Sequence, residues 1–347
     1  MPIVTTEHFK NGNLPLSKNG IPQVSDDDYH RLRGYKLEKD DIVFSRVGSI
    51  DINAYVEQSQ QGWLFSGRVL RVRPIKSVNS LCLHYILSTE SVKRSIRNRA
   101  VGQTMPSINT PILSNTKINI PQSVVEQKKI ANLLSLLDER ITTQNKIIDK
   151  LQSLIKGIVD CTILRKEKNA IVGDVCSISE QIRAEANIDD IITVRLHGNG
   201  VCKSSAENLQ LGATQYYRRR AGQLIYGKQN FHNGAIGIVP ISLDNGITSK
   251  DIPSFDIDEM KCNSVYLLAQ LQSPQYYKPA EALTTGTGSK RLKEETFLKM
   301  PIVLPNKREQ DNIAVLIHRA SMNLDHAKRL LELLSIQKQY LLRQMFI

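Results

Sequence analysis

The sequence predicts an α+β protein in which two mixed α/β domains are each followed by a long helix. Three observations predict this class. A helical pattern of about forty residues occurs twice, the same short sequence opens both copies, and the globular sequence in front of each copy also repeats.

Both helical patterns carry apolar residues at steps of three and four, which is typical of helices that pack along each other in a coiled coil. A single polar residue interrupts each pattern, Gln144 in the first and Lys338 in the second. One such pattern would also fit an ordinary helix with one face in a globular core, but two copies favour paired helices. At about 1.5 Å per residue, each helix would span roughly 60 Å. The first pattern comprises Ile130, Leu134, Leu137, Ile141, Ile148, Leu151, Ile155 and Ile158, the second comprises Ile313, Ile317, Ala320, Leu324, Ala327, Leu331, Leu334, Leu341 and Met345, and Leu133, Ile147, Leu154, Leu316 and Leu330 are expected to widen the apolar stripe.

The repeat extends into the globular sequence. Each helical pattern follows a proline, Pro121 or Pro305, and opens with a Glu-Gln pair at 126–127 or 309–310. Further upstream, residues 41–46 align with residues 223–228. We therefore expect a globular domain at 1–121, a helix at 122–165, a second globular domain at 166–305 and a second helix at 306–347.

Each globular domain is expected to mix strands and helices. In the first, apolar patterning predicts strands at 41–45 and 67–73 and helices at 80–88 and 90–100. In the second, it predicts strands at 224–226 and 235–239 and a helix at 264–271. A polar loop that contains glycine follows in each domain, at 102–107 and at 284–291.

Composition limits the class of partner. The chain of 347 residues has a net charge of +12, which favours a polyanion. Its five cysteines are widely spaced and form no C-x-x-C pair, so they are expected to be buried thiols in a reducing cytoplasm. No apolar run has the length of a membrane span, and the first residues lack a signal-peptide pattern. We expect a cytoplasmic protein without a membrane partner.

The chain carries the same order of features twice: a strand, a loop with Gly and Thr, Ile-x-Ile-Pro, Glu-Gln-x-x-Ile-Ala and a long helix. This order resembles the DNA-specificity subunit of type I restriction-modification enzymes. The resemblance covers nearly the whole chain; residues 126–141 are its most specific part, and the C-terminal copy, with Ala-Ser-Met-Asn at 320–323, matches less well. It implies two target-recognition domains, each reading half of a split DNA sequence, and an antiparallel coiled coil between them.

The same resemblance implies partners. Two modification subunits would dock on the helices, and restriction or motor subunits would dock through them. S-adenosylmethionine and ATP would be cofactors of those partners, and this chain would bind none. The residues expected to form the spacer and to dock subunits are Glu126, Gln127, Ile130, Leu134, Leu137, Ile141, Glu309, Gln310, Ile313, Ile317, Leu324 and Leu331.

The first recognition domain is expected to be shortened. Residues 171–223 precede the strand at Leu224, whereas only residues 1–41 precede the matching strand at Ile42. Members of the family usually carry an additional N-terminal lead-in, so an opening segment is expected to be missing.

Double-stranded DNA is the predicted ligand, because two similar readers on an antiparallel helix pair suit a duplex with two half-sites. For each candidate residue, a solvated surface side chain is the alternative interpretation. The basic residues expected to contact phosphates are Arg71, Arg73, Lys93, Arg94, Arg97 and Arg99, the loop residues expected to reach base edges are Arg46, Gln103, Thr104, Lys228, Asn230, Asn233, Thr287 and Lys290, and Arg291 lies in the same loop.

No catalytic residue or metal ligand is predicted. Residues 222–229 have the spacing of a phosphate-binding loop, but Gln229 stands where magnesium coordination needs a hydroxyl. A non-catalytic DNA-recognition subunit is the main hypothesis. A coiled-coil interaction scaffold without DNA recognition is the alternative, and an enzyme such as a methyltransferase comes third.

Overall fold

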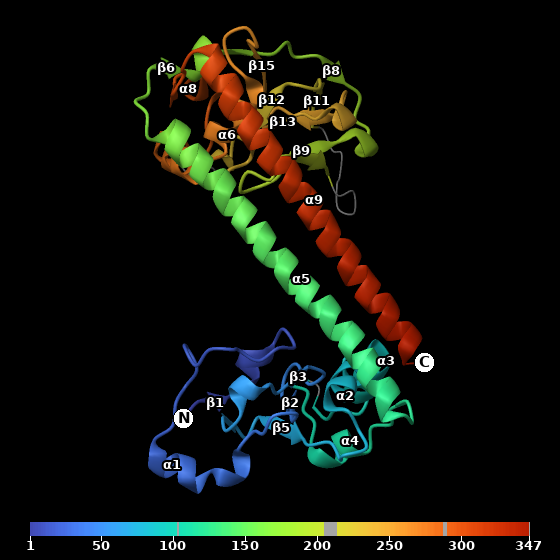
Figure 1. Cartoon of the computed structure of the whole chain (residues 1–347). Coiled ribbons are helices and arrows are strands. Elements are labelled where there is room, and N and C mark those ends of the chain that lie inside the picture. The colour runs from blue at the N-terminus through green and yellow to red at the C-terminus, as the bar shows by residue number, and fades with distance from the viewer. Residues whose placement is uncertain (103, 205–213, 287–289, 347) are drawn as a thin grey trace. The chain divides into compact units, whose positions relative to one another are not determined.

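The computed structural model describes residues 1–102, 104–204, 214–286 and 290–346 (Figure 1). The chain forms two compact units, which are described separately. Unit 1 comprises Met1–Asn145 and Arg329–Ile347, and unit 2 comprises Lys146–Lys328. Each unit therefore combines one globular part with one end of α5 (Val124–Val159) and one end of α9 (Lys307–Met345).

In unit 1 a small antiparallel sheet in the order β3-β2-β5 lies between two apolar clusters. Ile42 and Phe44 of β2 pack on one face with helix residues, and Val43 packs on the other face in the cluster that contains Trp63. Because both faces are covered, residues 42–44 of the strand are all apolar. The elements are β1 (Ile3–Val4), α1 (Asp26–Arg31), β2 (Ile42–Ser45), β3 (Asn53–Tyr55), β4 (Leu64–Phe65), β5 (Val69–Val72), α2 (Ser80–Leu87), α3 (Glu90–Arg97) and α4 (Thr110–Ser114).

In unit 2 the corresponding sheet has four strands in the order β13-β12-β15-β7, again with apolar residues on both faces. Leu224 and Tyr226 lie in the main core, and Ile225 lies in the cluster on the other face. The elements are the π-helical turn η4 (Asp160–Leu164), β6 (Ala170–Ile171), β7 (Cys176–Ile178), β8 (Arg183–Ala184), β9 (Ile192–Val194), β10 (Val201–Lys203), β11 (Tyr216–Arg218), β12 (Leu224–Tyr226), β13 (Ile236–Ile238), β14 (Ile247–Ser249), β15 (Ser254–Ile257), α6 (Ser264–Leu271), α7 (Pro274–Tyr277), α8 (Glu294–Leu298) and β16 (Pro301–Ile302).

The internal repeat is confirmed element by element. The predicted strands appear as β2, β5, β12 and β13, and the predicted helices appear as α2, α3 and α6. Asn79 and Asn263, which occupy matching positions, cap α2 and α6 with their side chains. The two globular parts therefore share a strand order and a helix entry.

The paired helices are also confirmed, one end in each unit. In unit 1, Leu134 and Leu137 of α5 pack with Leu334 of α9. In unit 2, Val159 at the end of α5 packs in the same core as Ile313 of α9. The early part of α5 therefore meets the late part of α9 in unit 1, and the late part of α5 meets the early part of α9 in unit 2. This means that the two helices run antiparallel.

Two expectations from the sequence are corrected. Cys82, Cys176 and Cys262 are buried free thiols as expected, but Cys161 is exposed and Cys202 is partly exposed. The residues expected to widen the helical stripe are outside the buried seam, because their exposed fractions are 41% for Leu133, 41% for Ile147, 53% for Leu154, 52% for Leu316 and 47% for Leu330.

His84 on α2 introduces a pH-dependent element into unit 1. Its side chain is 9% exposed, and its Nδ1 lies 2.7 Å from Oδ1 of Asn53. Burial lowers the pKa of His84 from 6.5 to about 4, and the nearby charge of Lys338 acts in the same direction. Between these two pH values, His84 is neutral in the folded state and protonated in the unfolded chain.

Unit 1 is expected to lose stability as the pH falls from about 6.5 towards 4, by roughly 3 kcal/mol in total. The folded pKa is depressed, so the contribution is fully present above the unfolded pKa and is lost below it. Trp63 is the single tryptophan and is 2% exposed in the unit 1 core, so its fluorescence reports unfolding of this unit. His84→Gln should flatten the pH dependence. An unchanged slope in the variant would assign the dependence to other groups.

Candidate nucleic-acid interface

The two units build a loop pair in the same way. The amide of Ile108 donates to the carbonyl oxygen of Arg46 at 2.9 Å, and the amide of Leu292 donates to that of Lys228 at 2.9 Å. Each bond ties the segment after the buried strand to the glycine-bearing loop. Gly102 has a φ of +100°, and a Cβ there would lie 2.8 Å from the carbonyl oxygen of Met105. Only glycine fits that turn.

In unit 1 this loop pair presents two of the predicted base-contacting residues, Arg46 and Thr104, at the surface. The amide of Gly48 donates to the carbonyl oxygen of Pro106 at 2.9 Å, which holds the two segments together. Thr104 and Arg46 are exposed, and Nη1 of Arg46 donates to the carbonyl oxygen of Gly67 at 3.2 Å. Gln103 lies outside the described residues.

In unit 2 the basic side chains of the loop pair are held by carboxylates. Lys228 lies 2.7 Å from Glu294 and its side chain is only 12% exposed. Arg291 lies 3.3 Å from Asp251. Lys290 lies 3.0 Å from Glu281, and this hydrogen bond lowers the pKa of the carboxyl group.

Two amides of the same region remain accessible. Nδ2 of Asn233 donates to Oδ1 of Asn230 at 3.2 Å; Asn230 is exposed and Asn233 is half-buried. Thr287 lies outside the described residues. The contact roles of all these side chains stay predictions.

Helix α3 carries the predicted phosphate-contacting residues of unit 1. Val92 and Ile96, four positions apart, are buried on one face, which leaves Lys93 and Arg94 toward the other. Arg94 is exposed and forms no ion pair with any residue that the structure describes. Arg97 pairs with Asp51 at 2.5 Å and with Glu90, which raises its pKa.

Outside α3, three more of the arginines predicted to contact phosphates form hydrogen bonds within unit 1. Nη1 of Arg99 donates to the carbonyl oxygen of Asn115 at 2.7 Å. Arg73 donates to both carboxylate oxygens of Asp41, at 2.7 and 2.8 Å, and Asp41 is 1% exposed. These hydrogen bonds raise the pKa of Arg73. Nη1 of Arg71 donates to the carbonyl oxygen of Lys36 at 2.7 Å.

Each long helix is joined to its globular part by a buried glutamine, which we call the glutamine clamp. In unit 1, Gln127 accepts from the amide of Asn79 at 2.7 Å and donates to the carbonyl oxygens of Pro121 at 2.7 Å and Ser77 at 3.4 Å. Gln127 is 2% exposed. The Glu-Gln motif thus fixes the start of the helix from inside the unit.

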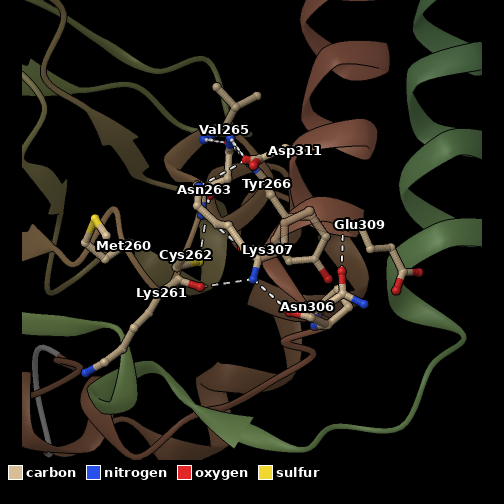
Figure 2. Close-up of polar contacts among 12 residues, drawn as sticks. Met260, Lys261, Cys262, Asn263, Val265, Tyr266, Asn306, Lys307, Glu309 and Asp311 are labelled. Carbon is tan, nitrogen blue, oxygen red and sulfur yellow. Dashed lines mark hydrogen bonds and ion pairs between the residues drawn. The ribbon is translucent and has the colours of Figure 1, made fainter.

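Unit 2 repeats the clamp. Gln310, which is 0% exposed, accepts from the amide of Asn263 at 2.9 Å and donates to the carbonyl oxygens of Lys261 at 3.1 Å and Pro305 at 2.8 Å. Figure 2 shows the surrounding contacts, in which Nδ2 of Asn263 donates to Asp311 at 2.8 Å. This hydrogen bond lowers the pKa of Asp311.

The polar break at Lys338 in the second helical pattern is explained by an ion pair in unit 1. Its Nζ lies 2.5 Å from Oδ1 of Asp138 on α5, and the hydroxyl of Tyr85 donates to the other carboxylate oxygen at 2.9 Å. A single polar contact inside an apolar seam fixes the register of paired helices. The sequence signal was the break itself, but its partner could not be recognised two hundred positions away.

The remaining spacer residues divide by burial. Leu134, Leu137, Ile313 and Ile317 are buried, while Ile130, Ile141, Leu324 and Leu331 are half-buried. Glu126 is exposed, and Glu309 pairs with Lys166 in unit 2. In unit 1 the apolar side chains of Leu136, Leu330, Leu333 and Ile336 are exposed by 59%, 47%, 55% and 56%. These four residues form the exposed helix stripe of unit 1.

Of the residues that the structure describes, none belong to a group of three or more His, Cys, Asp and Glu side chains placed to hold a metal ion. A membrane span would need a longer or more apolar helix than any the described ranges contain.

Part of the chain is similar in sequence to known proteins. Residues 1–153 match the family model described as the type I restriction modification DNA specificity domain. The chain is 32% identical over 165 residues to a protein of Methanocaldococcus jannaschii provisionally named the type I restriction enzyme MjaX specificity subunit, a match that covers 46% of this chain and 38% of that protein. It is 22% identical over 285 residues to the type I restriction enzyme MjaVIII specificity subunit of the same organism, covering 74% and 66%. The chain therefore spans less than two thirds of the length of both relatives.

The fold is similar to that of a solved structure. The crystal structure of the type I restriction-modification system S subunit from M. genitalium matches 90% of this chain and 84% of that chain, with a TM-score of 0.63 and 14% sequence identity. The chain has the fold of a DNA-specificity subunit. Over part of its length its sequence is similar to specificity subunits of type I restriction-modification systems, the family that the motifs in its sequence resemble.

Proposed function

We propose that this chain is a non-catalytic subunit that binds double-stranded DNA and gives a type I restriction-modification complex its sequence specificity. The observation that carries the proposal is the repeated loop pair, tied by the same backbone hydrogen bond in both units. Two readers of the same construction suit a bipartite target, in which each unit reads one half. The matched family domain at residues 1–153 supports this assignment.

The side chains available for base contacts are those that the fold leaves accessible. Arg46 and Thr104 in unit 1, and Asn230 and Asn233 in unit 2, carry donors and acceptors at the surface of the loop pairs. Arginine and asparagine are the side chains that most often read guanine and adenine edges. Arg73 and Lys228, in contrast, neutralise carboxylates within the fold.

Modification subunits are the proposed partners of the helices, with restriction or motor subunits attached through them. In unit 1 the exposed Leu136 and Leu330 border a groove of about 400 Å³ that Leu334 also lines. Exposed leucines on paired helices offer a surface for an apolar helix face. Two modification subunits would bind, and they and the motor subunits would hold S-adenosylmethionine and ATP.

The affinity of the chain for duplex DNA, measured as a function of salt concentration, tests the proposal. DNA binding should weaken steeply as salt rises, because each neutralised phosphate releases counterions. Absence of binding at low salt would favour an interaction scaffold without DNA recognition. If the chain does bind DNA, reconstitution with modification subunits and mapping of the methylated sites would show whether the target is bipartite.

Reversing the charges of Lys93 and Arg94 on α3 is expected to weaken binding to all DNA sequences alike, by roughly 10- to 100-fold, and to reduce the salt slope by about 2. Phosphate contacts position a protein on the duplex without specifying its sequence. Arg97 is left intact because it pairs with Asp51. Lys150→Glu with Lys156→Glu on exposed positions of α5 makes the same change in net charge and serves as the control. Equal losses in both variants would reject α3 as a contact surface.

A further inference from the structure

The β9–β10 hairpin of unit 2 lies against the loop pair of that unit. Its tip, residues 195–200, joins the two paired strands. The amide of His197 donates to the carbonyl oxygen of Asn233 at 2.7 Å, and the amide of Gly198 donates to that of Gly234 at 2.9 Å. Two backbone hydrogen bonds therefore hold the tip against the loop that carries Asn233.

Glycines make this close approach possible. Gly234 has a φ of +75°, and a Cβ there would lie 2.8 Å from Cε1 of Tyr277 and 3.0 Å from the amide nitrogen of Gly198. A Cβ on Gly237 of β13 would lie 2.9 Å from Cγ2 of Val201. A larger residue at either position would push the hairpin away from the loop. The contact is therefore built into the sequences of both segments.

The hairpin tip presents polar side chains to solvent. Arg195, His197 and Asn199 are exposed and occupy alternate positions of the tip. Nε of Arg195 donates to Sγ of Cys202 at 3.1 Å, and Nδ2 of Asn199 donates to the carbonyl oxygen of Leu196 at 2.9 Å. These hydrogen bonds orient the guanidinium and the amide. Side chains of these three types carry donors and acceptors that can meet base edges.

His197 adopts a backbone conformation that glycine would hold more easily. Its φ is +60°, in the left-handed region, where a Cβ costs free energy. Gly198 and Gly200 of the same tip have φ values of +70° and +73°. A histidine at a strained position, in a tip that otherwise uses glycine for this conformation, indicates a role for the imidazole itself.

The tip also supplies a cation that the loop pair of unit 2 lacks. Lys228, Lys290 and Arg291 are each held by a carboxylate. Arg195, in contrast, donates to a thiol and contacts no carboxylate in the described part of the chain. A guanidinium that keeps its net charge beside accessible amides suits a polyanion such as DNA.

We propose that the β9–β10 hairpin is a third DNA-reading loop of unit 2. His197 and Asn199 contact base edges in the same half-site as Asn230 and Asn233, and Arg195 contacts a phosphate beside them. The inference rests on the proposed DNA binding and adds residues that the sequence pattern did not single out. It makes the half-site of unit 2 the product of three loops, held together by the bonds of His197 and Gly198.

The test incubates the full chain with duplexes that contain randomised base pairs, and the bound DNA is recovered and sequenced. The unaltered chain should enrich a bipartite motif. His197→Gly should reduce the preference for one or two base pairs of one half by roughly tenfold and leave the other half unchanged. Hydrogen exchange at the amide of Gly198 should stay protected, because glycine suits the left-handed conformation.

Arg195→Gln should weaken binding to all sequences alike and reduce the salt slope by about 1. Arg319→Gln, at an exposed position of α9, removes the same charge within unit 2 and is the matched control. Equal effects of the two variants would overturn the phosphate contact of Arg195.

An unchanged motif for His197→Gly would reject the hairpin as a reading loop and leave the proposed function standing. A changed motif with lost protection at Gly198 would also reject it, because His197 would then act only by holding the hairpin in place. If the unaltered chain binds no DNA or enriches no motif, the proposed function itself fails and the inference fails with it.

Discussion

Exchange of residues 171–304 for the same segment of a relative with another target should replace one half of the recognised DNA sequence and leave the other half unchanged. The segment carries the sheets of unit 2, most of its cores and its own loop pair. The loop pair of unit 1 is built from residues 46–48 and 101–108, none of which is exchanged. Methylation mapping of a reconstituted complex would read both halves at once.

The reciprocal exchange provides the control. Replacing residues 1–120 should change the other half and preserve the one read by unit 2. If either exchange altered both halves of the target, the units would not read DNA separately, and the assignment of one half-site to each loop pair would fail.

Gln127→Leu is expected to lower the free energy of unfolding of unit 1 by about 2–4 kcal/mol, because the amide of Asn79 and two carbonyl oxygens lose their partner. Leucine has a similar volume, so little of the loss comes from a cavity. Denaturant unfolding followed by Trp63 fluorescence measures the change.

Matched variants separate the clamp from a general effect of substitution. Lys128→Leu changes the neighbouring exposed position and should leave the transition where it is. Gln310→Leu should act on unit 2, measured as faster hydrogen exchange in α6. A loss below about 0.5 kcal/mol for Gln127→Leu would mean that water replaces the clamp.

The sequence predicted the elements whose burial pattern is local. Residues 42–44 of β2 and all of β12 are apolar, and α2 and α6 are mostly apolar runs that begin after an asparagine cap. Their patterns could therefore be recognised without knowledge of any partner. Short strands such as β8, β9 and β11 were missed. Their two or three residues are ordered by pairing with distant strands, and no such short stretch shows a period.

The candidate site was predicted less completely, for a related reason. Arg73 and Lys228 carry the charge expected of DNA contacts, but each neutralises a carboxylate more than thirty positions away in the chain. Composition and spacing cannot distinguish a basic side chain held in the fold from one that is free. Arg94 and Arg46 remain exposed in regions where the sequence placed them, and these positions follow from local pattern alone.

The glutamine clamp has a consequence for how such proteins change over evolutionary time. The side-chain hydrogen bonds of Gln310 go to main-chain atoms of Lys261, Asn263 and Pro305, and those of Gln127 go to main-chain atoms of its own unit. These hydrogen bonds therefore depend on the position of the backbone and not on the identity of the side chains that it carries. Recombination can bring in a domain of quite different sequence and still present the carbonyls and amide that the glutamine needs. If each unit reads DNA as proposed, exchange of a whole domain would change the target while the helix that receives the domain keeps the same residues.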